Sequence, residues 1–422
     1  MNYYIFRNSD SAAPGIHLQP GTHITTGETS FKSYFGAVTS LESDLLLVAA
    51  SIFAADRGTQ RGEREDFARQ ISISIPVVNI GVIQSVRVEI EEVLRLLSND
   101  HWHVTFRQHP GNLDNTAAVS HDGSTLLFSG GLDSLAAALD YASGKNLALV
   151  SHVTHGSQTR NAQVDLVSML NQVGLAPPHY QFFVSSRDQG SFDHDVESSQ
   201  RTRSFMFLML AGLVARRLGH RRIVIIAENG QLAIHLPLNP ARVGAFSTHT
   251  AHPDVLVVMQ RILGQVFGYD VSIENPFSKK TKAEVVKRVW DRLRSAIPVA
   301  NSCWKSARLA EGITHCGECI PCLVRRVAIE THGNDPTAYG VDAFGADFAS
   351  LPPDSEARRN LADLGEFITC FGSMSDAELY DEWPELYSEN ISAPEIIGMY
   401  RRASAETRAV MQKYPGLAAV LT

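Results

Sequence analysis

The 422-residue chain has no excess of basic residues and no long apolar run, and each absence excludes a class of protein. Its formal net charge of −8 argues against a protein held on nucleic acid by bulk electrostatics. The longest apolar runs, near Leu45–Ala55 and Phe205–Ala215, are too short to cross a bilayer. The first residues lack a basic stretch followed by an apolar core, so no signal peptide is expected. We therefore expect a cytoplasmic protein without direct binding to nucleic acid or membrane.

The common nucleotide-binding loops are also absent, but a different glycine-rich turn is present. There is no G-x-x-x-x-G-K-[ST], and no G-x-G-x-x-G with an acidic residue about 20 positions later. Between an apolar run and a helical pattern lie Ser129, Gly130, Gly131, Leu132, Asp133 and Ser134. The glycines let the backbone approach an anion, and the N–H groups of the helix start point at it. We predict a phosphate cradle.

The side chains of this turn refine the prediction. Ser129 and Ser134 add hydroxyl donors for phosphate oxygens. Asp133 places a carboxylate among phosphates, which has a physical use mainly when Mg²⁺ lies there. The alternative is a plain serine–glycine turn in which Asp133 caps the helix.

Four of the five cysteines form a second motif: Cys303, Cys316, Cys319 and Cys322. Four thiolates, three of them separated by two residues each, can close a tetrahedral shell around a structural Zn²⁺. An iron–sulfur cluster is the main competing interpretation. Disulfides fit less well, since nothing marks the chain as secreted. We expect His315 to lie beside the site without being a ligand.

The middle of the chain alternates strand-like and helical segments, which predicts an α/β fold with a parallel sheet covered on both faces. The expected strands are Leu126–Phe128, Leu147–Val153, Gln181–Val184, Arg222–Ile226 and Asp270–Ile273. The expected helices cover about 133–143, 159–173, 202–218, 254–267 and 281–295. Ligands bind such folds beyond the C-terminal ends of the strands. The loops expected to line the site are His155–Gln158, Glu228–Gly230 and Asn275–Phe277.

We divide the chain into four regions. Residues 1–120 predict an α+β domain, with strands at Tyr3–Arg7, Ile71–Val78 and His103–Arg107 and helices near 41–54 and 88–98. Residues 121–300 form the nucleotide-binding domain, and 301–335 the zinc-binding segment. Residues 336–422 predict a helical region, in which Ser375 and Glu378 fit a capped helix start.

Together these motifs resemble the 7-cyano-7-deazaguanine synthase (QueC) family of PP-loop ATP pyrophosphatases. Ser129–Ser134 is similar to the PP-loop, and the cysteines with Arg325 to the family's zinc segment. Weaker similarities lie at Arg203–Phe205, His252–Asp254, Asn275–Phe277 and Lys282–Glu284. The resemblance runs from about Thr125 to about Arg326. It implies the PP-loop fold, similar to adenine nucleotide α-hydrolases, with a five-stranded parallel sheet.

The resemblance also implies a chemistry and roles. The family adenylates 7-carboxy-7-deazaguanine with ATP, lets ammonia displace AMP to give an amide, and dehydrates the amide with a second ATP. In this chain the PP-loop would bind ATP, Asp133 would bind Mg²⁺, and Arg203 and Lys282 would supply positive charge. For these two cations the alternative is an ordinary surface salt bridge.

The chain departs from the family in its two added regions and in the altered segment His155–Thr159. It resembles the long QueC-like proteins of bacterial anti-phage operons, the Qat and type IV CBASS groups. That implies an amide bond to the N-terminal amine of a partner protein from the same operon, with residues 1–120 as a possible docking domain. One alternative is a small-molecule synthase. The other is a non-catalytic nucleotide-binding subunit, and the complete S-G-G-x-D-S motif disfavours this second alternative.

Overall fold

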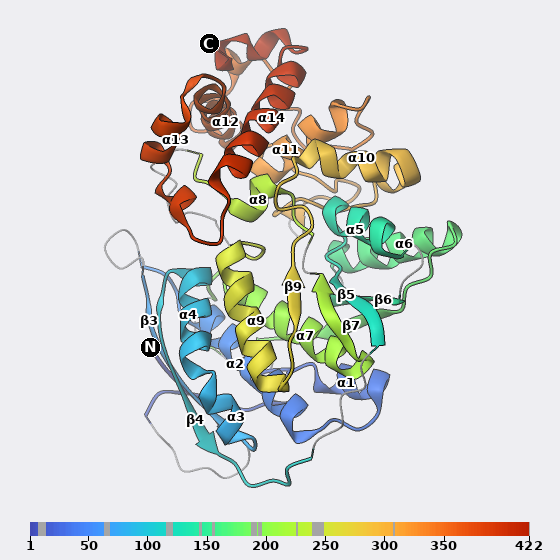
Figure 1. Ribbon diagram of the computed structural model, residues 1–422. Coiled ribbons are helices and arrows are strands. Elements are labelled where there is room, and N and C mark those ends of the chain that lie inside the picture. The colour runs from blue at the N-terminus through green and yellow to red at the C-terminus, as the bar shows by residue number, and fades with distance from the viewer. Residues whose placement is uncertain are drawn as a thin grey trace.

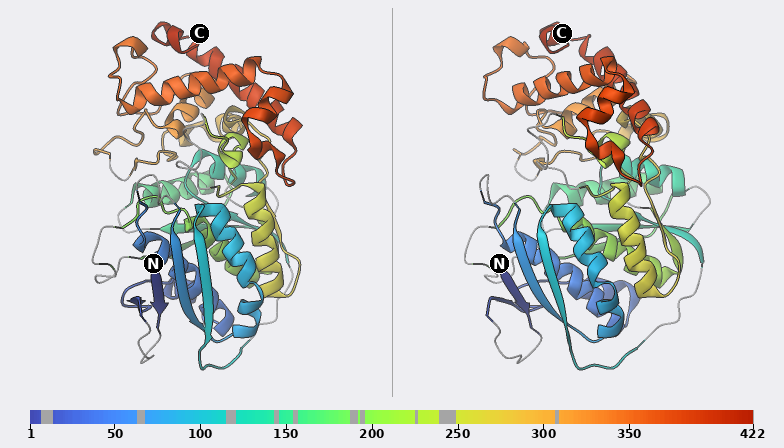
Figure 2. Two further views of the ribbon diagram at one scale, coloured as in Figure 1. Left: turned by 90° about the vertical axis from the view of Figure 1, so that its left-hand side faces the viewer. Right: turned by 60° about the vertical axis from the view of Figure 1, so that its left-hand side comes forward.

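The computed structural model describes residues 1–6, 14–62, 68–114, 121–142, 146–153, 157–186, 192, 196–224, 227–238, 249–306 and 309–421 (Figure 1). Within these ranges the chain forms two parallel sheets, separated by helices, and a helical C-terminal region that covers one end (Figures 1 and 2). No described helix is long and apolar enough to cross a membrane. The predictions for residues 155–156 and 225–226 lie outside the described residues.

The central sheet has the strand order β7-β6-β5-β8-β9, and every pair is parallel. Its strands are β5 (His121–Leu127), β6 (Asn146–Val153), β7 (His179–Phe183), β8 (His220–Val224) and β9 (Ser272–Glu274). The chain moves outward from β5 through β6 to β7, then returns to β8 on the other side of β5. A ligand site is therefore expected beyond the C-terminal ends of β5 and β8.

Helices cover both faces of the central sheet, as predicted. One face carries α7 (Arg203–Leu218) and α9 (Pro253–Phe267), and the other carries α5 (Leu132–Ala142) and α6 (Gln158–Gln172). The helix α10 (Lys282–Leu293) packs against α5. The five predicted strands and five predicted helices all occur, with ends shifted by a few residues. The strand β5 begins five residues before its predicted start, since His121–Thr125 also pair with neighbours.

The N-terminal region forms its own sheet, with the order β2-β1-β3-β4. Its strands are β1 (Asn2–Ile5), β2 (Ile16–Leu18), β3 (Gln70–Val77) and β4 (His101–Gln108), and its helices are α1 (Glu28–Phe35), α2 (Ser40–Gly58), α3 (Ile80–Ser85) and α4 (Arg87–Ser98). The predicted strands and helices of this region are confirmed, while β2, α1 and α3 were not predicted. All its strand pairs are parallel, so the helices act as crossovers, as in an α/β unit.

The two sheets share one apolar core. The helix α2 packs on α7 and α4 packs on α9, so two helical layers lie between the sheets (Figure 2). The buried core runs without a break from Ile73 and Phe53 through Leu208 and Met259 to Ile273. Two helices of the nucleotide-binding region therefore rest on the N-terminal region.

The remaining elements gather beyond the C-terminal end of the central sheet (Figure 1). They are α8 (Gly230–Ile234), α11 (Ile320–Glu330), α12 (Glu356–Ser373), α13 (Asp376–Glu382) and α14 (Ala393–Met411). The predicted capped start at Ser375 is confirmed, because Ser375 and Glu378 form a reciprocal capping box before α13. The predicted helical character of this region is confirmed.

Candidate functional site

The turn after β5 has the backbone that a phosphate cradle needs. Gly130 adopts a left-handed conformation, with φ at +84°, which a side chain would strain. Ser134 Oγ donates to the carbonyl of Gly131 at 3.0 Å and lies 3.2 Å from Ser129 Oγ. The helix α5 begins directly afterwards at Leu132, so its first N–H groups face the turn.

Asp133 is the centre of a buried polar group at this turn. Its Oδ1 accepts a hydrogen bond from Lys282 Nζ at 2.8 Å, and this contact is also an ion pair. Its Oδ2 accepts from Asn229 Nδ2 at 2.9 Å and from the Asn229 backbone N–H at 3.3 Å. All three residues are buried. This contact is compatible with the prediction that Asp133 and Lys282 belong to one site. The alternative for Lys282, a surface salt bridge, does not describe the contact, because both residues are buried.

Local sequence explains why Lys282 reaches this position. Thr281 caps α10 and forms a reciprocal capping box with Glu284. Lys282 is therefore the first residue of the helix, and its side chain is held beside the start of α5. The Lys282 backbone N–H donates to Gln231 Oε1 at 2.8 Å, which ties α10 to α8.

The loop after β8 supplies a second carboxyl group. Glu228 precedes Asn229, and its backbone carbonyl accepts from Asn275 Nδ2 at 2.8 Å. Burial and the nearby charge of Asp133 raise the pKa of Glu228 to about 7. The loops Glu228–Gly230 and Asn275–Phe277 thus lie where the strand order predicts.

Arg203 occupies a different part of the same sheet edge, at the first residue of α7. Its guanidinium lies 4.8 Å from the centre of the Phe207 ring. Burial, with a smaller contribution from Arg57, lowers the pKa of Arg203 to about 10. Within the described ranges its Nε has no hydrogen-bond partner. The structure therefore does not bring Arg203 into the Asp133–Lys282 pair, and places it as a half-buried cation at the start of α7.

One buried acceptor, on His152, lies close to Arg203. His152 Nε2 donates to the carbonyl of Val184 at 3.0 Å, which leaves Nδ1 as a buried acceptor without a partner among the described residues. Burial, followed by the charge of Arg203, lowers the pKa of His152 to about 3. Gln163 Nε2 donates to the Ser129 carbonyl at 3.4 Å, so this side chain connects α6 to the turn.

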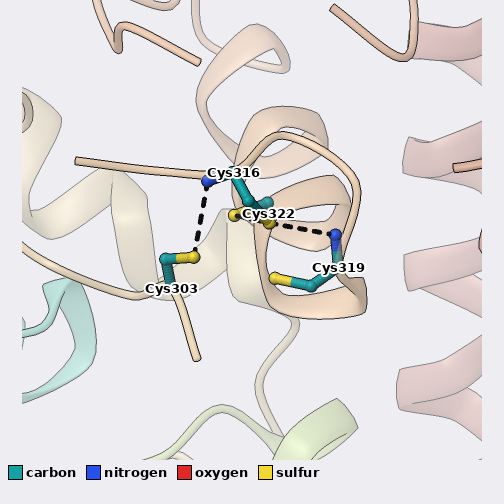
Figure 3. Close-up of side chains that lie close together, drawn as sticks. All are labelled: Cys303, Cys316, Cys319 and Cys322. Atoms are coloured by element: carbon teal, nitrogen blue, oxygen red, sulfur yellow. Dashed lines mark hydrogen bonds between the residues drawn. The ribbon is translucent and has the colours of Figure 1, made fainter. Parts of the chain in front are cut away.

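The four cysteines meet as predicted. The Sγ atoms of Cys303, Cys316, Cys319 and Cys322 all lie within 4.8 Å of one another, and all four residues are buried. Figure 3 shows three of them around the start of α11, with Cys303 approaching from a separate segment. Backbone N–H groups of Cys316 and Cys319 donate to Cys303 Sγ and Cys316 Sγ, each at 3.4 Å. Such N–H···S contacts stabilise thiolates, so the set fits a closed structural Zn²⁺ site.

The zinc segment also touches the phosphate turn. The Asn301 N–H donates to the Gly130 carbonyl at 2.9 Å, and Asn301 Oδ1 accepts from the Cys303 N–H at 3.1 Å. His315 is fully buried and accepts from the Ser302 N–H at 3.2 Å, so it lies beside the four thiols as predicted. The cysteine segment therefore supports the glycine-rich turn at residues 129–134.

The sequence analysis did not assign roles to Asn229, Gln231 or Glu228, although it placed the loop of two of them at the site. An asparagine directly before a short helical run is a recognisable helix cap. Its second role, as a donor to Asp133, depends on the sheet order and leaves no local sequence signal.

Comparison with known proteins identifies the family of this segment. Residues 197–333, about a third of the chain, match the family described as queuosine biosynthesis protein QueC. The matched range contains Arg203, Lys282 and the four cysteines, and begins after the turn at residues 129–134. A search of the curated proteins finds no match. The chain thus carries a QueC-like domain on an α/β fold, which supports an ATP-using enzyme of the PP-loop type.

Proposed function

We propose that this chain adenylates 7-carboxy-7-deazaguanine with ATP and joins it through an amide bond to an amine. The observation that carries the proposal is the buried pair of Asp133 and Lys282, 2.8 Å apart, at a glycine-rich turn of a chain with a QueC-like segment. The turn and the start of α5 would hold the ATP phosphates. Lys282 would place a fixed positive charge where negative charge grows on the leaving pyrophosphate.

The donor set at the turn fits a magnesium ion. Asp133 offers a carboxylate. The Glu228 carboxyl is near it, and the charge of Asp133 contributes to the raised pKa of Glu228. Mg²⁺ is usually bound by one or two carboxylates together with substrate phosphates. A bound Mg²⁺ would neutralise negative charge on the phosphates. In the structure, the Lys282 ammonium neutralises the charge of the Asp133 carboxylate.

The first step forms one bond and breaks one. A carboxylate oxygen of the acid attacks the α-phosphorus of ATP, and pyrophosphate leaves. In the second step the amine nitrogen attacks the acyl carbon, AMP leaves with the bridging oxygen, and the amine loses a proton to solvent or a nearby base. The protein contributes by aligning the reactants and excluding water.

The proposed acceptor is the N-terminal amine of a small partner protein from the same bacterial anti-phage operon. The support is that about two thirds of the chain lies outside the QueC-like segment. The second candidate is a synthase that makes 7-cyano-7-deazaguanine from the acid, ammonia and ATP. The similarity of residues 197–333 to the queuosine biosynthesis protein QueC favours that candidate.

The test combines the purified chain with ATP, Mg²⁺, 7-carboxy-7-deazaguanine, and either ammonium or each protein encoded beside it. We expect AMP, pyrophosphate and a partner whose intact mass has risen by the mass of the acid minus water. The same mixture with the Asp133→Asn variant is the control. Efficient release of free 7-cyano-7-deazaguanine, with no protein adduct, would establish the second candidate instead.

A further inference from the structure

The helix α8 is too short to hold itself in place, yet both partners of Asp133 depend on it. It has five residues, Gly230–Ile234, and a helix of this length is not stable alone. Asn229, which donates to Asp133, is its N-cap through a bond from the Leu232 N–H at 3.4 Å. Gln231, in its first turn, accepts from the Lys282 N–H. Some other part of the protein must therefore fix α8.

Tyr400 of the C-terminal helix α14 is that part. Its hydroxyl donates to the Gln231 carbonyl at 3.0 Å and accepts from the Leu236 N–H at 3.3 Å, so one group joins the first turn of α8 to the segment that follows the helix. The Tyr400 side chain is 2% exposed and lies 4.9 Å, between ring centres, from Phe371. Its position is thus set by the packed C-terminal helices.

Neighbouring residues of α14 tighten the same contact. A Cβ at Gly230 would lie 2.4 Å from the Ser278 carbonyl oxygen, so the backbone before α10 requires glycine here, and 2.8 Å from Met399 Cε of α14, which packs on the same position. The Gly230 N–H donates to the Lys280 carbonyl at 2.8 Å. The start of α8 is therefore enclosed between α14 and the segment before α10.

The same helix also fixes the start of α10. The Thr281 hydroxyl, which caps α10, donates to Glu406 Oε1 at 3.0 Å. Arg402 pairs with Glu284 at 2.8 Å and donates to the Lys279 carbonyl at 3.0 Å. Both segments that converge on Asp133 therefore rest on α14.

We propose that Tyr400 is a positioning residue, which holds α8 so that Asn229 and Lys282 keep Asp133 in place at the phosphate turn. Its effect on catalysis rests on the proposed ATP chemistry. The residue lies outside the QueC-like segment at 197–333. The C-terminal helical region thus supports the site by holding α8 in place, and does not itself contact the substrate.

The test compares Tyr400→Phe with Tyr414→Phe. Tyr414 follows α14, donates to Glu330 at 2.8 Å and accepts from Arg326 at 3.1 Å, so the control loses a hydroxyl from the same region but contacts α11 instead of α8. Amide hydrogen exchange is followed in the full chain at Leu232, Ala233 and His235, whose N–H groups bond within α8 and not to Tyr400. We expect faster exchange at these amides in Tyr400→Phe only.

Activity provides the second readout. In Tyr400→Phe, kcat for AMP release should fall about tenfold or more with KM for ATP nearly unchanged, because alignment matters most in the transition state. Unchanged exchange in α8, equal acceleration in both variants, or a wild-type kcat in Tyr400→Phe would each overturn the proposal. If the wild-type protein releases no AMP, the proposed function is wrong. The hydrogen-exchange comparison would still decide whether Tyr400 holds α8 in place.

Discussion

Asp133 does more in the structure than the motif alone predicts. The sequence suggested a carboxylate for Mg²⁺, and the structure shows both of its oxygens engaged, one by Lys282 and one by Asn229. A buried carboxylate of this kind orders a cation beside the phosphate turn. The role of Asp133 as a metal ligand stays a prediction, whereas its role as the centre of the polar group is a structural fact.

Asp133→Asn should reduce pyrophosphate release by about 100-fold or more, because it removes the negative charge that holds Lys282 and serves a metal. Circular dichroism at the assay temperature should show a folded protein, although the buried ammonium lowers its melting temperature. Asp140→Asn is the matched control, since Asp140 lies on the same helix and pairs with Arg288 and Arg292. Pyrophosphate release at the wild-type rate by a folded Asp133→Asn protein would refute the assigned role.

Glu406 should make stability depend on pH. Burial raises its pKa from 4.5 to about 7, so the folded protein binds this proton more tightly than the unfolded chain. The free energy of unfolding should therefore decrease as pH rises through this window, by an amount on the order of 1 kcal/mol for a partly screened group.

The pH dependence is measured as melting temperature at pH 5 and pH 8. Glu406→Gln keeps an acceptor for Thr281 but cannot ionise, so it should lose less stability than the wild type between these values. Glu395→Gln changes an exposed residue of the same helix and should keep the wild-type decrease. An identical decrease in Glu406→Gln and the wild type would contradict the assignment.

At the scale of the elements, the cysteine segment is joined to the glycine-rich turn by hydrogen bonds. Asn301 links them by accepting from the Cys303 N–H and donating to the Gly130 carbonyl. The metal would thus stabilise the turn without taking part in the reaction. Four thiols leave no ligand position open for water, which fits a structural role.

We expect one tightly bound zinc per chain, measured by elemental analysis. Cys319→Ser should lose the metal and melt about 10 °C lower or precipitate, because structural zinc contributes folding energy directly. Cys370→Ser makes the same change at the cysteine outside the cluster and should keep both zinc and melting temperature. Iron with acid-labile sulfide in place of zinc would show that the metal is wrongly assigned.

The elements predicted well are those whose own sequence carries their pattern. The buried strand β6 and the amphipathic helix α10 bury an apolar set that is visible in the sequence. The strand β2 has three residues and α8 has five, so neither is long enough for its pattern to repeat. Such elements form because neighbours hold them, which is also why the contacts of Asn229 and Gln231 could not be predicted.

At the scale of the whole molecule, the N-terminal region packs against the helices of the central sheet. Asp56, at the end of α2, accepts from the Thr202 N–H and hydroxyl, each at 2.9 Å, directly before α7 begins. The same carboxylate pairs with buried Arg69, which also pairs with Asp100. The N-terminal region therefore sets the start of the helix that carries Arg203.

A fragment of residues 121–422 should accordingly fail to fold. Without α2 and α4, the apolar faces of α7 and α9 that pack on them would be exposed to water. Expression and solubility of the fragment and the full chain, with the same tag, test this. A soluble fragment with a cooperative melting transition would show that the N-terminal region is a separable domain.

The central claim, that the acid is activated as an adenylate, is tested most directly by tracing an oxygen atom. The chain is incubated with ATP, Mg²⁺, the amine acceptor and 7-carboxy-7-deazaguanine labelled with ¹⁸O in its carboxylate, and the nucleotide products are weighed. Attack of the carboxylate on the α-phosphorus leaves one of its oxygens in AMP, so we predict AMP that carries a single ¹⁸O. Unlabelled AMP, or ADP with inorganic phosphate, would contradict the account.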